Sequence, residues 1–447
     1  MNTFRIGGVH PHDNKIYSAH QPITECPLPQ KAVIPLVQHI GAPAQPVVEK
    51  GQKVKAGELL AKAGGFVSAN IHSPFSGTIT KIDSTVDAWG MRMPAIFMDV
   101  EGNEWLETID RTPDVIREFN LEPKQIIDRI ADAGIVGLGG ACFPTHVKLM
   151  PPPGKKAEVL IVNGVECEPY LTCDHQLMLE HGEEIMIGIQ LLMRALGIQK
   201  AVIGIEKNKP DAIARMQELA SKTLGVEVRP LKLKYPQGGE KQLIDACIRR
   251  QVPSGALPIE VGAVVDNVAT IYAVYEAVQK RKPLISRVMT VTGKSLAKPG
   301  NYLVRFGTPL SQVIEMAGGV PADTGKIIGG GPMMGRAMNN IDMPANKRTS
   351  GLLFLPEAES RRTEPENCIR CGKCVSACPM GLEPYLLAKQ AELQMWDEME
   401  QHDVMDCIDC GCCLFTCPSH RPLLDYIRMG KAQVGGIIRA RQAAQKK

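Results

Sequence analysis

The sequence is poor in aromatic residues, in net charge and in long apolar runs. Phenylalanine, tryptophan and tyrosine make up 4% of its 447 residues, and the net charge at pH 7 is +3. Such a weak charge argues against nucleic acid as a partner, because phosphate recognition usually shows as a strongly basic domain. The longest apolar run, near residues 185–193, is about half of the roughly 18 residues that a membrane-spanning helix needs. The composition therefore predicts neither a nucleic-acid partner nor a transmembrane helix.

The first residues also lack the apolar segment of a secretory signal. The N-terminus has the sequence MNTFRIGGVHPHDNK, and this predicts a cytosolic chain. The protein nevertheless has 14 cysteines, which in a reducing compartment are more often metal ligands than disulfide partners. Most of them fall between Cys368 and Cys417, so a C-terminal domain is expected to use them together.

Two segments of that domain repeat one cysteine pattern. CIRCGKCVSACP begins at Cys368, CIDCGCCLFTCP begins at Cys407, and both follow C-x2-C-x2-C-x3-C-P. In this pattern three close cysteines bind one 4Fe–4S cluster and the fourth binds the other cluster. Cys412 aligns with Lys373 of the first copy and therefore lies outside the repeat. The spacing predicts one ligand set of Cys368, Cys371, Cys374 and Cys417, and a second set of Cys407, Cys410, Cys413 and Cys378.

Structural zinc is the alternative for these cysteines. Zinc sites usually appear as separated C-x-x-C pairs that close one tetrahedron, so two complete copies of the longer pattern favour iron–sulfur clusters. Residues 383–403, between the copies, have apolar side chains at helical spacing and no glycine or proline after Pro384. We therefore expect a helical ferredoxin module.

Upstream of this module, strands and helices alternate. The pattern predicts helices over 122–133 and 211–224 and buried strands over 157–165 and 200–205, which is typical of a largely parallel sheet covered by helices. The glycine-rich stretch 134–149, GIVGLGGACFPTHVKL, could hold a phosphate on its backbone N–H groups. It does not match the dinucleotide fingerprint G-x-G-x-x-G, and on its glycines alone a plain tight turn is equally expected.

Four segments resemble the flavoprotein subunit of respiratory complex I and the related hydrogenase and formate dehydrogenase subunits. GLGGACFPTHVK, from Gly137, is similar to the flavin loop GxGGAxFPTxxK, and NGVECEP, from Asn163, is similar to N-x-x-E-x-E-P. YPQGGEK, from Tyr235, resembles Y-x-x-G-E-E, and VDNVAT, from Val265, resembles V-N-N-V-E-T. The segments follow the order of that family, and the resemblance implies bound FMN with NAD(H) as its substrate.

The resemblance also implies individual roles. The FMN phosphate is expected on the glycine loop, the flavin ring or its ribityl chain near Lys148 and Asn163, and the nicotinamide nucleotide against Phe143 and Glu168 as the catalytic pair. The implied cofactor-binding residues are Gly137, Gly139, Gly140, Ala141, Thr145, Lys148, Asn163, Glu166, Tyr235, Gly238, Glu240, Asn267 and Thr270.

The sequence departs from that family at four positions. Leu138 replaces an arginine, Val165 an aspartate, Gly239 a glutamate and Asp266 an asparagine. These changes bear on individual flavin contacts rather than on the fold.

The two neighbours of the flavin domain resemble other small domains. Residues 46–82 are similar to a lipoyl or biotinyl carrier domain, but Phe66 stands where a carrier has its cofactor-bearing lysine, so we expect a docking module. Residues 287–343 resemble the β-grasp domain that binds soluble ligands after the flavin domain in complex I. The tail from Arg421 is rich in arginine and lysine, which is commonly a solvated face but would also suit an acidic partner or anionic lipid.

The whole order of domains resembles the RnfC family, which belongs to the Rnf ion-translocating oxidoreductase complexes. The expected fold is a multidomain α/β and α+β chain with a β-sandwich hybrid barrel, a Rossmann-like flavin domain, a β-grasp domain and a helical ferredoxin domain with two 4Fe–4S clusters. The expected limits are 1–115 for the barrel, 116–285 for the FMN and NAD(H) domain, 286–350 for the β-grasp domain, 355–430 for the ferredoxin domain and 431–447 for a basic tail.

This resemblance implies a peripheral subunit on the cytoplasmic face of the bacterial inner membrane. It would exchange electrons between NAD(H) at FMN and two clusters, in a complex that couples ferredoxin:NAD oxidoreduction to Na⁺ or H⁺ transport. The implied partners are a ferredoxin-like cluster subunit, integral membrane subunits and, indirectly, ferredoxin. Two alternatives remain: a soluble flavin and iron–sulfur NADH dehydrogenase or bifurcating subunit, and a non-enzymatic electron adaptor with a degenerate flavin site.

Overall fold

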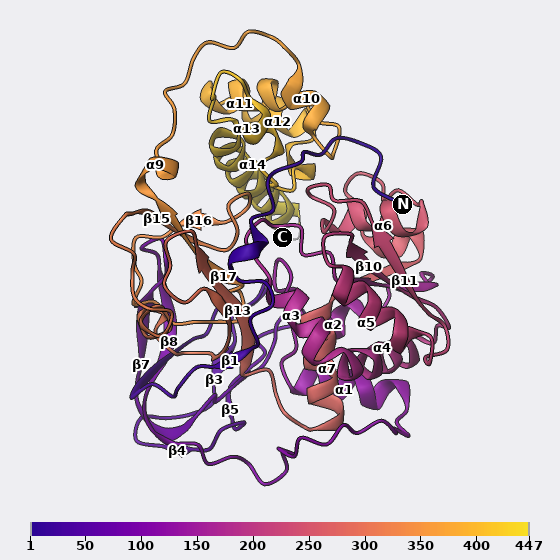
Figure 1. The fold of residues 1–447 in the computed structure, drawn as a ribbon, viewed down its shortest axis with the longest axis vertical. Helices are drawn as coiled ribbons and strands as arrows, with labels where there is room; N and C mark the ends of the chain where they lie inside the picture. The colour runs from indigo at the N-terminus through magenta and orange to yellow at the C-terminus, as the bar shows by residue number, and fades with distance from the viewer. Residues whose placement is uncertain (1, 446–447) are drawn as a thin grey trace.

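The computed structural model describes residues 2–445. Figure 1 shows a helical module at the top of the molecule, a β-rich part below it on the left and a mixed helix and sheet part on the right. Within the described residues, no helix has both the length and the apolar character needed to cross a bilayer.

The N-terminal domain is a sandwich of two small antiparallel sheets, with strand orders β2-β8-β7-β4 and β3-β5-β6. Ile34, Leu60, Phe75 and Ile96 are fully buried between them. Phe66 lies in the connection between β5 and β6 and is 69% exposed, as expected for the tip of a carrier hairpin. The strands are β2 (Lys31–Pro35), β3 (Gln45–Pro46), β4 (Lys53–Val54), β5 (Leu59–Lys62), β6 (Ile71–His72), β7 (Ser76–Val86) and β8 (Arg92–Gly102).

The second domain is built on a four-stranded parallel sheet with the order β11-β10-β9-β12. The predicted helices and strands of this region are confirmed, with ends that differ by a few residues. The elements are α1 (Pro123–Asp132), α2 (Thr145–Lys148), β9 (Val159–Asn163), α3 (Cys173–Glu180), α4 (Gly182–Leu196), β10 (Ala201–Glu206), α5 (Pro210–Ala220), β11 (Val226–Leu231), α6 (Glu240–Ile248), η2 (Pro258–Val261), β12 (Ala263–Asn267) and α7 (Val268–Gln279).

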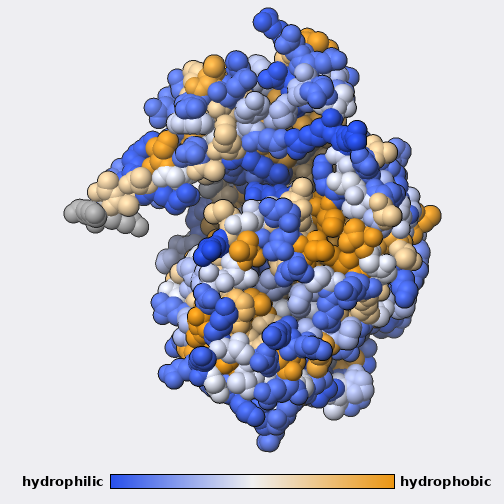
Figure 2. All heavy atoms as spheres, turned by 90° about the vertical axis from the view of Figure 1, so that its left-hand side faces the viewer, coloured by the Kyte–Doolittle hydropathy of each residue, from blue (hydrophilic) through white to orange (hydrophobic). Residues whose placement is uncertain are grey.

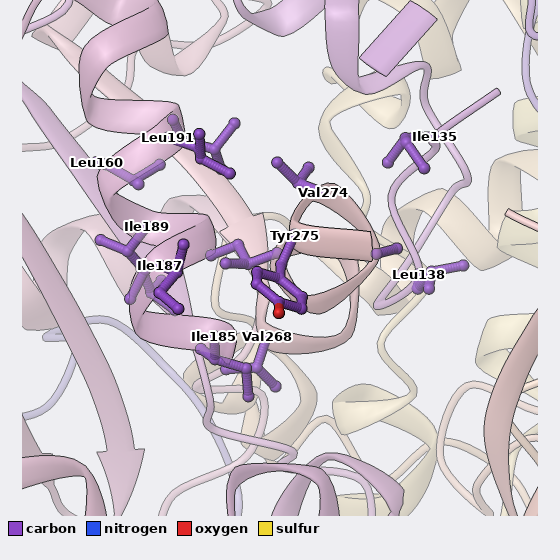
Figure 3. Close-up of a cluster of buried hydrophobic side chains, with 14 of the residues drawn as sticks. Ile135, Leu138, Leu160, Ile185, Ile187, Ile189, Leu191, Val268, Val274 and Tyr275 are labelled. Atoms are coloured by element: carbon purple, nitrogen blue, oxygen red, sulfur yellow. The ribbon is translucent and has the colours of Figure 1, made fainter. Parts of the chain in front are cut away.

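The core of this domain lies between α4 and α7 on one face of the sheet (Figure 3). Side chains of α4 face Val268, Val274 and Tyr275 of α7, and Leu138 of the glycine loop lies on the other flank of α7. Leu138 is only 5% exposed, so its side chain anchors the loop in the apolar core. This packing accounts for an apolar residue at a position where the complex I family has an arginine.

The third domain is a six-stranded mixed sheet with the order β1-β14-β13-β17-β15-β16. Strand β1, from near the N-terminus, pairs in parallel with β14, so the chain returns to its own beginning here. The elements are η1 (Lys15–Tyr17), β1 (Thr24–Glu25), β13 (Ser286–Gly293), β14 (Gly300–Arg305), α8 (Leu310–Met316), β15 (Thr324–Gly329), β16 (Arg336–Ala337), β17 (Gly351–Pro356) and α9 (Glu357–Ser360).

The C-terminal module is helical, as predicted, but residues 383–403 form two helices rather than one. Gln394 adopts a left-handed φ of 57°, which ends the first helix before the second begins. The expected limit after residue 430 falls inside one long helix, and Lys446 and Lys447 of the basic tail lie outside the described residues. The elements are α10 (Lys373–Ala377), α11 (Pro384–Glu392), α12 (Trp396–Gln401), η3 (Val404–Asp406), α13 (Cys412–Thr416) and α14 (Leu423–Gln445).

Figure 2 shows the face that carries the barrel, turned toward the viewer. Hydrophilic side chains cover most of it, and the surface is hollowed between the upper module and the body of the molecule. The upper module is therefore in contact with the rest of the protein over only part of its underside. Its contacts with the second domain are described with the cysteine sets below.

Candidate flavin site and cluster sites

The glycine loop lies beside the carboxyl ends of β9 and β12. Its base is closed by two backbone hydrogen bonds, from Gly137 N to Phe143 O at 2.9 Å and from Thr145 N to Ile135 O at 3.0 Å. Between these anchors Gly139, together with Gly140 and Ala141, is exposed. The backbone N–H groups of the loop tip are therefore accessible to a ligand, as a phosphate cradle requires.

The loop is fixed to the N-terminus of α7. Leu138 N donates to Thr270 Oγ1 at 2.8 Å, and Asn267 caps the helix by accepting from Ala269 N at 2.8 Å. A Cβ on Gly139 would lie 2.7 Å from the Asn267 amide nitrogen, so only glycine fits there. The N-terminus of a helix attracts anions, and here it adjoins the glycine loop as the resemblance implies.

Lys148 lies at the edge of this cradle in an acidic environment. Its Nζ donates to Val265 O at 2.7 Å and lies 3.4 Å from Glu240 and 3.8 Å from Asp266. Burial opposes the charge on Lys148, but Asp266 and Glu240 outweigh it and hold the pKa of Lys148 above its usual value. Burial raises the pKa of Asp266 to about 6, and Lys148 limits that rise.

Several polar atoms of the cradle have no hydrogen-bond partner among residues 2–445. They are Thr145 Oγ1 and both carboxylate oxygens of Asp266. Buried polar groups are normally paired, so these atoms fit a site that receives a polar ligand. The accessible loop, the helix N-terminus and these atoms together fit FMN.

Asn163 joins the end of β9 to the segment from Tyr235. Its side-chain nitrogen donates to Gly238 O at 2.9 Å, and Gly238 N donates to Cys167 Sγ at 3.3 Å. The structure thus gathers members of all four flavin segments at one edge of the sheet.

Glu166, expected among the cofactor-binding residues, lies beside the start of α3. Its carboxylate accepts from Asp174 N at 2.7 Å and from His175 N at 3.4 Å, and so caps the start of α3. Lys15, from the N-terminal segment, lies 3.8 Å from the same carboxylate. Burial, together with Glu166, raises the pKa of Asp174 to about 7, while a hydrogen bond from Asn267 at 2.6 Å limits the rise.

Glu168 lies at the junction of three domains. Its carboxylate accepts from the backbone N–H groups of Met333 at 3.1 Å and Met334 at 2.7 Å, in the loop between β15 and β16. Burial raises the pKa of Glu168, and these hydrogen bonds act against the rise. Tyr235, only 2% exposed, points its hydroxyl at the same place, 3.4 Å from Glu168 and 2.9 Å from Cys410 O, to which it donates.

The second predicted ligand set is assembled in one place, because Cys378, Cys407, Cys410 and Cys413 line a single cavity. Cys412 also borders it, but its thiol is fully buried and points at Tyr235 O, 3.9 Å away. Four thiols around one cavity fit a cluster with sulfur ligation.

The first ligand set faces outward. Cys368 and Cys371 are exposed, whereas Cys374 and Cys417 are half-buried. Burial raises the pKa of the Cys374 thiol, and Cys417 contributes to the rise. The two sets thus differ in their surroundings.

The N-terminal segment Gly7–Val9, called the strap below, ties the buried set to the flavin domain. Gly8 N donates to Ala377 O at 2.9 Å, and Val9 exchanges two 2.9 Å backbone hydrogen bonds with Tyr235. Figure 1 shows this N-terminal stretch passing between the upper module and the domain on the right. The strap, Tyr235 and Cys410 form one buried apolar contact between the two domains.

Four known domain families match the chain in this order. Residues 3–103 match the RnfC barrel sandwich hybrid domain, 130–276 the Nuo51 FMN-binding domain, 288–337 the SLBB domain and 361–418 the 4Fe-4S dicluster domain. Each match falls on one of the four parts described above.

Full-length relatives are also found. The chain is 46% identical to a subunit of the proton-translocating ferredoxin:NAD(+) oxidoreductase complex of Clostridium ljungdahlii, over 97% of this chain and 94% of that protein. It belongs to the RnfC family. The corresponding subunit of the Na(+)-translocating ferredoxin:NAD(+) oxidoreductase complex of Acetobacterium woodii is 42% identical, over 97% of each chain. That of the ion-translocating oxidoreductase complex of Rhodobacter capsulatus is 41% identical, over 87% of this chain and 75% of its own.

A solved NAD+-reducing [NiFe]-hydrogenase, in its air-oxidized state, shares the fold. The TM-score is 0.50 with 20% sequence identity, over 70% of this chain and 63% of that chain. The likeness concerns the architecture only.

The sequence analysis did not predict several residues that reach the site from outside the flavin domain. Arg287 donates from β13 to Leu138 O at 3.1 Å, Lys15 borders Glu166, and the amides of Met333 and Met334 bind Glu168. All come from parts of the chain far from the flavin segments, so no local spacing could have indicated them. The sequence offered one signal for Arg287: it is the only charged residue in the otherwise uncharged segment RVMTVTG, and in the structure it is buried.

Proposed function

We propose that the chain is the peripheral electron-transfer subunit of a membrane complex that couples ferredoxin:NAD oxidoreduction to Na⁺ or H⁺ movement. It exchanges electrons between NAD(H), FMN and two 4Fe–4S clusters. FMN, when bound, supplies the conversion between the two electrons of a hydride and the single electrons that clusters accept. The observation that best supports electron transfer between FMN and the clusters is the hydrogen bond from Tyr235 to Cys410 O, which joins the flavin domain to a set of four cysteines.

The site residues divide the work. The glycine loop and the N-terminus of α7 hold the FMN phosphate, Lys148 and Asn163 face the flavin, and Phe143 with Glu168 receives the nicotinamide. The amides of Met333 and Met334 already donate to the Glu168 carboxylate, so a nucleotide that contacts this carboxylate also lies beside the loop between β15 and β16.

The surroundings of the two cysteine sets support an order for them. The set that contains Cys378 and Cys410 is buried against the flavin domain, and the set that contains Cys368 and Cys371 is exposed. In this proposal the buried set exchanges electrons with the flavin site and the exposed set exchanges them with a partner protein of the complex.

The proposal also covers the folds of the individual domains, the partners and the location of the chain. The flavin domain is Rossmann-like and the SLBB part is a β-grasp domain. The domain limits remain predictions, with β17 lying beyond the expected limit at 350 and α14 running past that at 430. The partners are a ferredoxin-like cluster subunit and integral membrane subunits, and the chain is bound at the cytoplasmic face of the inner membrane.

Anaerobic reduction by NADH tests the function and the order together. In Cys371→Ser, which disturbs the exposed set, NADH should still reduce the remaining cluster as seen by electron paramagnetic resonance. In Cys413→Ser, NADH reduction of the remaining cluster should be lost or greatly slowed, although dithionite still reduces it. The reverse pattern would invert the order, and a wild type that has both clusters but neither binds FMN nor reacts with NADH would favour the adaptor alternative.

A further inference from the structure

A buried arginine of the SLBB part reaches the back of the glycine loop. Arg287, on β13, is 5% exposed and donates to Lys347 O at 2.6 Å and to Leu138 O at 3.1 Å. A third, weaker contact runs to Val288 O at 3.3 Å. The guanidinium group therefore spans the interface between two domains and ends at the loop that we assign to the FMN phosphate.

No carboxylate lies within 4.0 Å of this guanidinium group in the part of the chain that the structure describes. Carbonyl oxygens satisfy some of its donors but do not neutralise its charge, and a buried cation without a nearby anion is strongly destabilising. Burial raises the pKa of the nearby Asp174, and the charge of Arg287 acts against that rise. The surroundings of Arg287 are thus suited to an additional anion.

The backbone of Leu138 is held from both sides. Its N–H donates to Thr270 of α7 at 2.8 Å, and its carbonyl accepts from Arg287. Its side chain is buried in the core beside α7, where a charged side chain could not be accommodated (Figure 3). Position 138 therefore contributes packing to the loop but no charge, whereas Arg287 brings a positive charge to the Leu138 carbonyl from another domain.

We propose that Arg287 is a positioning residue for the FMN phosphate: it fixes the Leu138 carbonyl and supplies the positive charge that position 138 lacks. Flavin affinity then depends on the docking of the SLBB part onto the flavin domain. This inference rests on the proposed function, because it requires that the glycine loop receives FMN.

The test compares FMN with riboflavin, which lacks the phosphate. Dissociation constants of the two flavins are measured by fluorescence quenching on the full-length, flavin-free protein, with its iron content verified. In Arg287→Met we expect FMN binding to weaken about 10-fold, the lower end of the range for a charge-assisted hydrogen bond, because Arg287 acts through the loop backbone. Riboflavin binding should change little, because it lacks the phosphate. Arg287→Lys, which keeps the charge, should retain most of the preference for FMN.

Arg305 provides a matched control. It is a buried arginine of the neighbouring strand β14, but it donates to Pro74 O at 3.0 Å and Asn103 at 2.7 Å in the barrel. Arg305→Met should leave the ratio of the two dissociation constants unchanged, because Arg305 contacts the barrel and not the glycine loop. An equal loss of FMN and riboflavin affinity in Arg287→Met, or no loss, overturns the inference alone, whereas a wild type that binds neither flavin overturns the proposed function as well.

Discussion

Asp266 shows how one residue can tune the flavin site through burial. Its carboxylate is fully buried at the carboxyl end of β12, 3.8 Å from Lys148, and its pKa is raised to about 6 from 3.8. The folded state therefore binds a proton between these two values that the unfolded state does not bind. The stability contribution of Asp266 is largest below pH 4 and is lost as the pH rises through 6.

We expect Asp266→Asn to stabilise the flavin-free protein at pH 8. The shift of about two pKa units corresponds to roughly 3 kcal/mol at pH 8 and to about half of that at pH 5. The difference in melting temperature between variant and wild type should therefore shrink as the pH falls. Asp128, exposed on α1, provides the control, and Asp128→Asn should melt like the wild type at both values. A gain that is independent of pH would contradict the titration of Asp266.

Cys412 and Cys413 are adjacent but are expected to differ completely in function. Cys412 lies outside the repeat and points its thiol at Tyr235 O, whereas Cys413 belongs to the set around the cavity. Cys412→Ala should keep close to the eight irons of two 4Fe–4S clusters, while Cys413→Ala should lose or convert one cluster. Iron and acid-labile sulfide analysis of anaerobic protein measures this, and the opposite result would invalidate the ligand sets.

At the scale of elements, the strap is the feature that holds the buried cysteine set against the flavin domain. Gly7 has a left-handed φ of 64°, and a Cβ there would lie 2.3 Å from Cys378 O. The strap therefore passes so close to a predicted cluster ligand that only glycine fits.

Gly7→Ala should push the strap away from Cys378 and make one cluster labile. We expect the iron content to fall from about eight toward about four per chain on brief exposure to air, since only the buried set contacts the strap. Gly51→Ala is the matched control, because Gly51 also has a left-handed φ, of 87°, but a Cβ there meets no atom within 4 Å. It should therefore keep its clusters as the wild type does. Equal air sensitivity of both variants would mean that backbone strain, and not the contact with Cys378, is responsible.

At the scale of the whole molecule, the functional parts meet at shared junctions. One junction joins the flavin, SLBB and cluster parts and is formed by Tyr235, Glu168 and the loop of Met333. A second joins the SLBB part to the barrel and the flavin domain. There Lys347 donates to Asn70 O at 2.9 Å and to Gly134 O at 2.7 Å. A change in one domain is thus expected to alter the sites of its neighbours.

The attachment of the chain to its complex gives a prediction at the same scale. The described residues contain no helix suited to cross a bilayer, and the described part of α14 ends in exposed basic residues that include Arg439 and Arg441. We expect high salt or alkaline washing to release the chain from membranes while integral subunits stay behind, because polar protein contacts are screened by salt. Immunoblots of the wash and the pellet measure this. Retention of the chain through both washes would contradict a peripheral attachment.

The sequence alone determined the features that depend on local spacing. The cysteine repeat predicted both ligand sets, and the alternation of apolar segments predicted the strands and helices around the glycine loop, because ligation geometry and secondary structure act over a few residues. Helix ends were less certain: Gln394 interrupts a segment whose apolar pattern continues through it.

Only the tertiary structure decided which residues work together across domains. Three such contacts join positions more than a hundred residues apart: that of Arg287 with Leu138, that of the strap with Cys378, and that of the Met333 and Met334 amides with Glu168. Such contacts depend on how whole domains pack, and packing is set by the shapes of buried surfaces that no local pattern of residues records.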